Sequence, residues 1–191
     1  MVRAHSSRSL LMRIPLKPND LSEPAETIAA MRKRRGGPLA SLDRILLNSP
    51  PMAKAWNDFM GTIRGDIMVD ARIRELVICS LAALHSSDAA FNQHLIAFRK
   101  LGGNEMQASA LRDPVTAVGN RALFPGLDRA ILALTVEMTR KTKVSDPVVA
   151  AIRTAFNEQQ LLDLMGLISA YIMVFRFLGA VGFAESDGFP E

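Results

Sequence analysis

The sequence predicts an all-α protein, and two observations support that prediction. Of its 191 residues 49% are hydrophobic but only 6% are aromatic, so Leu, Ile, Val, Ala and the ten Met must supply the core. Ala, Leu and Met are good helix formers, whereas strands are enriched in β-branched and aromatic residues. Nearly every segment also repeats its apolar residues at helical spacing. A chain of this length suits one compact domain, which we expect to span residues 12–191.

The N-terminal third is expected to hold three helices. The first has Ser22 as its N-cap and Pro24 early in its first turn, and it ends at Arg35 ahead of two glycines. Two short amphipathic helices follow at residues 39–48 and 52–64, with a Pro-Pro pair between them. Proline removes a backbone donor and ends a helix that precedes it, so the pair should divide the two helices.

Two longer helices are predicted in the middle of the chain, at residues 70–84 and 87–101. Asp70 caps the first helix, whose apolar residues follow the i, i+3, i+4 rule. The second helix carries its apolar residues on one stripe and ends at Gly102-Gly103. A short turn near His85-Ser86 joins the two, so the segment is a helix–turn–helix.

The rest of the chain is expected to form four helices and one loop. The loop follows Asp113-Pro114, and the helices are predicted at residues 104–111, 127–140, 145–156 and 157–182. The last helix contains an apolar run at residues 164–175, which is too short to span a bilayer. A helix that is apolar on all sides is instead buried in the core or against another subunit.

The charge pattern does not favour nucleic acid as a partner. The net charge is +4, and the basic run at residues 32–35 lies in a last helical turn, where cations suit the helix dipole. No aromatic residues are interleaved with it to stack on bases. We therefore expect neither a nucleic-acid nor a membrane partner, and a mildly basic surface suits a small anionic molecule.

The single cysteine, Cys79, excludes an intrachain disulfide or thiol relay. It lies in an apolar run, so we expect a buried core residue rather than a reactive thiol. Residues 1–11 are rich in Arg and Ser and are expected to be a disordered extension, with Met12 as an alternative start. No secretory signal, cofactor motif or metal-binding pattern is recognised. We expect a cytoplasmic protein that needs no cofactor and no metal.

Glu75 and His94 are the candidate chemical groups. If residues 70–101 fold as an antiparallel hairpin, the Glu75 carboxylate can approach the His94 imidazole. A carboxylate beside an imidazole fixes its tautomer and gives an acid/base couple that works near neutral pH. Ser87 lies two turns before His94 on the same side of the second helix. The pattern alone leaves a surface glutamate and an ordinary hydrogen-bonded histidine open.

Several motifs in this order resemble the carboxymuconolactone decarboxylase and alkylhydroperoxidase D family. The central block is residues 72–78, followed by the ten-residue segment that ends in His94 and by residues 99–102. Residues 12–16 are similar to the usual opening of the longer members, and residues 46–56 to a segment that ends in tryptophan. Residues 160–179, with Tyr171 and Arg176, are similar to the last helix. The resemblance covers most of the chain from residue 12 onward.

The resemblance implies an alkylhydroperoxidase D-like helical bundle with a central helix hairpin and a homo-oligomer, either a trimer or a hexamer. Glu75 and His94 match the acid/base residues of the family. Its two cysteines fall on Ser87 and Ala90, and neither a serine hydroxyl nor an alanine can attack a peroxide and form a disulfide. We expect Glu75, His94 and Ser87 to be catalytic. The residues expected to bind the substrate are Arg72, Arg176 and Tyr171.

Three functions remain open at this point. The first is a cofactor-free acid/base enzyme like the decarboxylases, in which His94 donates a proton, Glu75 is its partner and an arginine holds the substrate carboxylate. The second is an oligomeric binding or scaffold protein that has lost the chemistry, and for it Ser87 would be only a helix cap. The third, a thiol peroxidase that uses Cys79 or an outside thiol, is disfavoured.

Overall fold

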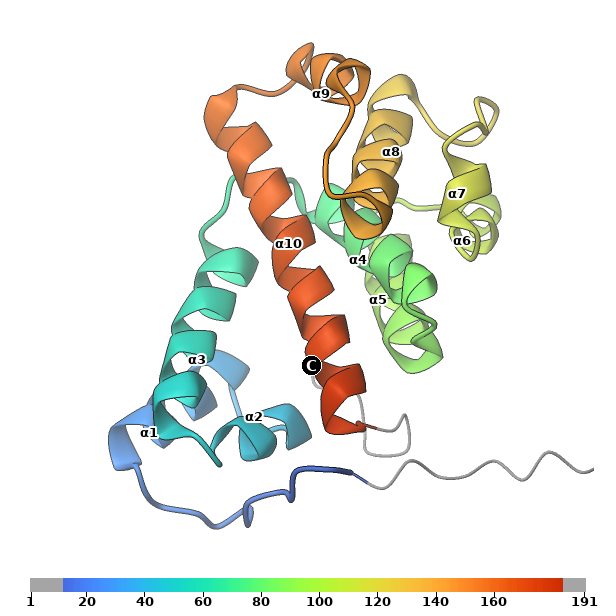
Figure 1. Cartoon of the computed structure of the whole chain (residues 1–191). Helices are drawn as coiled ribbons and strands as arrows, with labels where there is room; N and C mark the ends of the chain where they lie inside the picture. Colours follow the sequence, from blue (N-terminus) through green and yellow to red (C-terminus); the bar gives the residue numbers. More distant parts are fainter. Residues whose placement is uncertain (1–11, 184–191) are drawn as a thin grey trace, which may run out of the picture. The chain divides into compact units, whose positions relative to one another are not determined.

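The computed structural model describes residues 12–183, and in this part of the chain it contains helices and no strand. The all-α prediction is therefore confirmed (Figure 1). The predicted disordered extension, residues 1–11, lies outside the described residues. The helices are α1 (Ala25–Arg35), α2 (Ser41–Leu46), α3 (Pro50–Gly65), α4 (Ala71–Leu84), α5 (Asp88–Lys100), α6 (Glu105–Ala110), α7 (Pro114–Ala117), α8 (Gly126–Arg140), α9 (Asp146–Arg153) and α10 (Glu158–Val181).

The chain divides into two compact units. The first unit comprises the residues up to Asn57 and those from Phe177 onward, and the second comprises Asp58–Arg176. Helices α3 and α10 each contribute residues to both units. The single domain that we expected over residues 12–191 remains a prediction.

A buried carboxylate organises the first unit. Asp43 on α2 is fully buried, and its Oδ2 accepts a hydrogen bond from Arg35 Nε at 2.8 Å. Arg34 also donates to Asp43 Oδ1 at 3.2 Å, and to Asn57 Oδ1 at 2.7 Å. Since a buried charge must be paired, Arg34 and Arg35 neutralise the Asp43 carboxylate. The end of the basic run at residues 32–35 therefore stabilises this unit.

Three local predictions were wrong. Ser22 is not the cap of α1: Pro24 occupies that position, and the Glu23 carboxylate accepts a hydrogen bond from the Ala25 amide at 3.1 Å. The Pro-Pro pair at residues 50–51 forms the first turn of α3 instead of a linker, because the first turn needs no amide donors. The expected loop after Asp113 contains the short helix α7, which Asp113 caps through the Thr116 amide.

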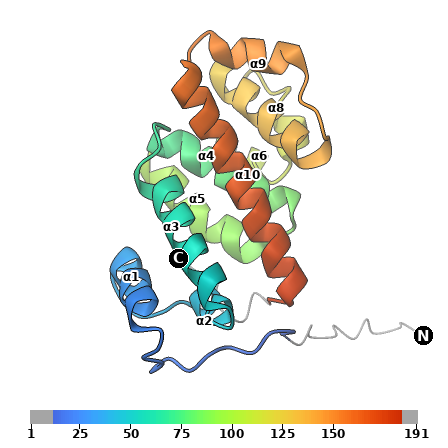
Figure 2. The same ribbon diagram turned by 60° about the vertical axis from the view of Figure 1, so that its left-hand side comes forward.

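The second unit is built around the predicted hairpin. Helices α4 and α5 lie side by side in both views of the chain, and α8 packs on α4 (Figures 1 and 2). As predicted, Asp70 caps α4, and its Oδ1 accepts hydrogen bonds from the Arg72 and Ile73 amides at 2.9 and 3.2 Å. Helices α7 and α9 in turn pack on α8. The unit thus holds both arms of the hairpin in a helical core.

Helix α10 extends further than its apolar run. Of the helices in the described residues, it alone is long and apolar enough to cross a membrane. Half of its most apolar stretch is buried, which is also the pattern of a core helix in a soluble protein. Its beginning was predicted correctly, since the Asn157 side chain caps it through the Gln160 amide at 2.9 Å.

Candidate functional site

A tight turn joins the two arms of the hairpin at residues 85–87. Ser86 has a φ of +55°, the left-handed conformation that L-residues rarely adopt. The Ser87 amide then donates to the Ala82 carbonyl at 2.9 Å and closes the turn. Ser87 is the N-cap residue of α5, which runs back along α4.

The hairpin brings Glu75 and His94 together. Their side chains meet at 2.8 Å between Glu75 Oε2 and His94 Nδ1, with 15% and 9% of their surfaces exposed. A carboxylate can only accept a hydrogen bond, so the proton of this bond lies on Nδ1 of His94. Proton exchange with a ligand would therefore pass through Nε2, while Glu75 fixes the tautomer and the orientation of the ring.

Two aromatic residues one turn apart on α10 complete this region. Tyr171 is buried and meets the His94 ring edge-on, with ring centroids 6.2 Å apart. Phe175 lies 6.4 Å from Tyr171 between centroids, and it stacks on His85 at 5.3 Å. The predicted site residue Tyr171 is thus placed against His94, where it restricts the motion of the imidazole.

Ser87 does not serve as an ordinary helix cap. It occupies the N-cap position of α5, but its side chain makes no capping hydrogen bond. Capping, which could have explained the serine from the sequence, is therefore not what its hydroxyl does here. The residue is partly exposed at the turn that precedes α5.

Cys79 is a buried thiol, as predicted. It has no exposed surface, and burial is the main reason that its pKa is raised, with the nearby Glu75 carboxylate adding to the effect. Arg99 opposes the shift only in part. Since the thiolate is the nucleophilic form, Cys79 remains an unreactive thiol near neutral pH.

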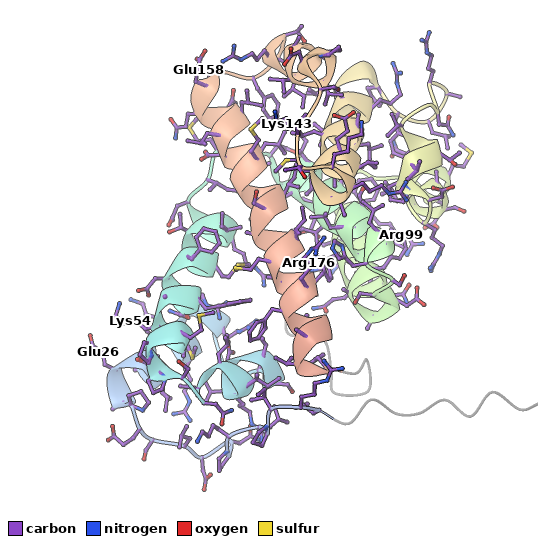
Figure 3. The ribbon with its side chains drawn as sticks, in the orientation of Figure 1. Glu26, Lys54, Arg99, Lys143, Glu158 and Arg176 are labelled. Carbon is purple, nitrogen blue, oxygen red and sulfur yellow. The ribbon has the colours of Figure 1, made fainter. Side chains whose placement is uncertain are left out.

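The two candidate arginines have different environments. Arg72 forms a two-pronged ion pair with the buried Asp128 of α8, and its guanidinium lies 5.8 Å from the centre of the Phe98 ring. The hydrogen-bonded Asp128 carboxylate raises the pKa of Arg72 and burial lowers it. The carboxylate has the larger effect, so the pKa of Arg72 is raised. Arg176 is exposed on α10, directly after Phe175 (Figure 3). It makes no ion pair within the residues that the structure describes.

Sequence reasoning missed His85. The residue was treated only as part of the turn, although it is one of three histidines in the chain. Its ring contact with Phe175 joins residues 90 positions apart, so local spacing gave no indication of it. In the described part of the chain, no group of three or more His, Cys, Asp or Glu residues could hold a metal ion. The polar groups gathered in this region are the imidazoles of His85 and His94, the Glu75 carboxylate and the hydroxyls of Ser87 and Tyr171.

No family model and no curated protein matches the sequence. Solved structures do match the fold. An uncharacterized peroxidase-related protein from Silicibacter sp. TM1040 has a TM-score of 0.71 and 15% identity, over 97% of this chain and 97% of that one. A peroxidase-related protein with an alkylhydroperoxidase AhpD core from Ralstonia eutropha JMP134 has a TM-score of 0.68 and 16% identity, over 90% of each chain. The debrominase Bmp8 has a TM-score of 0.67 and 11% identity, over 90% of each chain. The alkylhydroperoxidase D-like fold is therefore established, whereas identities this low carry no activity with them.

Proposed function

We propose that this chain, which has the alkylhydroperoxidase D-like fold, is a cofactor-free acid/base enzyme. It would act on a small anionic substrate, by decarboxylation or by proton transfer to and from a lactone or enol. The observation that carries the proposal is the 2.8 Å contact between Glu75 and His94, which orients an imidazole by a carboxylate. Both side chains also retain some exposed surface.

The decarboxylation can be written with these residues alone. The bond between the substrate carbon and its carboxylate breaks, carbon dioxide leaves, and the electron pair remains on the substrate as an enolate. His94, protonated at Nε2, then gives its proton to the enolate carbon and recovers a proton from water. Glu75 stabilises the imidazolium through Nδ1 in the same way that a buried carboxylate orients other catalytic histidines.

Arg176 is the arginine that we propose for the substrate carboxylate. The guanidinium of Arg72 is already paired with the Asp128 carboxylate through two of its nitrogens, whereas Arg176, the residue after Phe175 on α10, is exposed. Arginine binds carboxylates with two parallel hydrogen bonds, which suits this task. The Ser87 hydroxyl would donate a hydrogen bond to a substrate oxygen.

Thiol chemistry is poorly supported. Cys79 is fully buried with a raised pKa, and Ser87 and Ala90 stand where the resemblance expects cysteines. A non-catalytic binding or scaffold role is the second candidate. The ion pair between Arg72 and Asp128 favours it, because this arginine is then engaged within the protein and not with a substrate carboxylate.

The predicted homo-oligomer, a trimer or a hexamer, and the cytoplasmic location belong to this proposal. Exposed apolar side chains in the second unit, Leu162 at 70% and Met68 at 52%, are consistent with a subunit contact.

The test is a screen for carbon dioxide release and for solvent deuterium exchange, using carboxymuconolactone and related lactone and keto acids. We expect His94→Ala to lower kcat by roughly a hundredfold or more, because general acid/base groups contribute about that much. Cys79→Ser is the matched control and should leave turnover unchanged. If both variants retain wild-type turnover, or if Cys79→Ser alone abolishes it, the acid/base proposal is wrong. Circular dichroism of each variant checks that it is folded.

A further inference from the structure

We infer that a second copy of this chain packs on the exposed side of α10, with the two α10 helices antiparallel about a two-fold axis. The inference rests on the proposed function and assigns a surface to its homo-oligomer. Its basis is the exposure of α10. The most apolar stretch of this helix is as hydrophobic as a membrane span, yet only half of it is buried. A helix that is apolar on all sides needs a partner on all sides.

One seam of residues along α10 is open to solvent. Its members are alternately four and three residues apart, which is the heptad spacing by which two helices pack side by side. They are the exposed or partly exposed residues Glu158, Leu162, Met165, Ser169, Ile172 and Arg176. Leu162 has 70% of its surface exposed, whereas Leu167 and Val174, on the opposite side of the helix, are buried. The seam is therefore the side of α10 that the second unit leaves uncovered.

The seam carries opposite charges at its two ends. Glu158 begins it and Arg176 ends it, at positions about 27 Å apart along an α-helix (Figure 3). Glu158 lies 3.8 Å from Arg153, but 87% and 57% of these side chains are exposed. Such an exposed ion pair contributes little, so the Glu158 carboxylate can pair with a cation of another chain.

These charges select the direction of the second helix. Parallel pairing would bring two like charges together at each end of the seam. In antiparallel pairing, with the two-fold axis level with Leu167, Glu158 of each copy lies opposite Arg176 of the other. Opposite charges that meet across an interface fix its register and exclude alternatives. The ends of the seam are therefore complementary to themselves in the antiparallel orientation alone.

The same register pairs the residues between the charged ends. It places Leu162 opposite Ile172 and Met165 opposite Ser169, each twice by symmetry. Met68, with 52% of its surface exposed, extends the apolar surface beside the seam, because its amide donates at 2.8 Å to the carboxylate of the residue that follows Leu162. Apolar layers thus lie between two ion pairs, as in a helix–helix interface with an apolar core and a polar rim.

Arg176 is also the arginine proposed for the substrate carboxylate. The two roles are compatible, because a guanidinium has five N–H donors and can bind a carboxylate on more than one edge. Glu158 of the second copy would take one edge and the substrate another. The contact between copies would then hold in place a side chain that is otherwise exposed on α10.

The first test is the mass of the full chain in solution, measured by analytical ultracentrifugation without any ligand. We expect an even number of subunits, either a dimer or a hexamer, and Leu162→Lys should lower the mass at least twofold. The matched control Met106→Lys places the same charge on an apolar side chain of α6 that is 64% exposed, and it should keep the wild-type mass. A monomeric or trimeric wild type, a wild-type mass for Leu162→Lys, or equal losses in both variants would overturn the inference.

The second test reverses the charges at the ends of the seam. Glu158→Arg and Arg176→Glu each place like charges opposite one another, and each should raise the dissociation constant of the contact roughly tenfold or more. The double variant Glu158→Arg/Arg176→Glu restores opposite charges and should recover most of the affinity. Wild-type dissociation constants for the single variants, or a double variant that associates no better than they do, would refute the antiparallel register. Circular dichroism checks that each variant is folded.

A lipid bilayer is the other apolar partner that an exposed helix face could meet. Sedimentation with vesicles of phosphatidylcholine and phosphatidylglycerol tests it, and we expect the wild-type chain to stay in solution. Binding to these vesicles that Leu162→Lys abolishes would overturn the inference, because the seam would then contact lipid.

The outcome is distinguishable from that of the proposed function, because association is measured without turnover. If Leu162→Lys lowers the mass while His94→Ala has no effect on catalysis, the contact between copies stands and the acid/base enzyme does not. If His94→Ala abolishes turnover while Leu162→Lys keeps the wild-type mass, the enzyme stands and the contact through α10 does not.

Discussion

The ion pair between Arg72 and Asp128 predicts how much stability the fold loses when either residue is replaced. The two losses show whether Arg72 has a structural role. The two partners are unequally buried: 6% of the Asp128 side chain is exposed, compared with 25% of the Arg72 side chain. Breaking a buried pair costs most when the charge that remains cannot be hydrated. Removal of Arg72 should therefore destabilise the fold more than removal of Asp128.

The expected magnitudes follow from these exposures. Arg72→Met leaves a nearly inaccessible carboxylate in the first turn of α8, and we expect a loss of about 3 kcal/mol, near the lower end for a buried pair because Arg72 is partly solvated. Asp128→Asn leaves a guanidinium that still contacts water and the Phe98 ring, and it should cost about 1–2 kcal/mol. The double variant Arg72→Met/Asp128→Leu removes both charges and should recover most of the loss.

Urea unfolding, monitored by circular dichroism at 222 nm, measures the free energy of unfolding of each of the three variants and of the wild type. The reasoning is refuted if Asp128→Asn destabilises the protein as much as Arg72→Met does, or if Arg72→Met unfolds at the wild-type urea concentration. In the latter case Arg72 would be available for the substrate carboxylate, as the sequence had predicted.

Two further predictions concern stability in the second unit. Gly103→Ala should cost about 1–3 kcal/mol, because its Cβ would overlap the buried ring of Phe98. The control Gly65→Ala, with nothing within 4 Å of its Cβ, should not destabilise the protein, and equal melting temperatures for the two variants would contradict this. The Lys141 ammonium, and after it the Ser145 amide, lowers the pKa of Glu137 to about 2 from an ordinary value of 4.5. This lowered pKa stabilises the fold above about pH 4.5, and the stabilisation is lost as the pH falls toward about 2. Melting curves of Glu137→Gln should therefore depend less on pH between these limits than those of the wild type, and a parallel dependence would show that Glu137 plays no such role.

Much of the candidate site could be predicted from local sequence. The spacing of Glu75 and His94 around a short turn was enough to expect their contact, because helix period and hairpin reversal together fix which residues face each other. Cys79 could be placed in the core from its apolar neighbours. Ser87 was located correctly at the start of α5, but its side-chain hydrogen bonding depends on the backbone angles of the turn, which the sequence does not specify.

The sequence by itself determined the helices other than α7, the Asp70 and Asn157 caps and the positions of the two candidate acid/base residues, since these depend on period and on neighbours a few residues away. The tertiary structure decided the partners that lie far apart along the chain. Arg72 pairs with Asp128 across 56 positions, and Phe175 stacks on His85. Such contacts arise from the packing of whole helices, where one long side chain can reach several alternative partners. For this reason the structure, and not the sequence, distinguished the paired Arg72 from the exposed Arg176 and revealed a second histidine in the site.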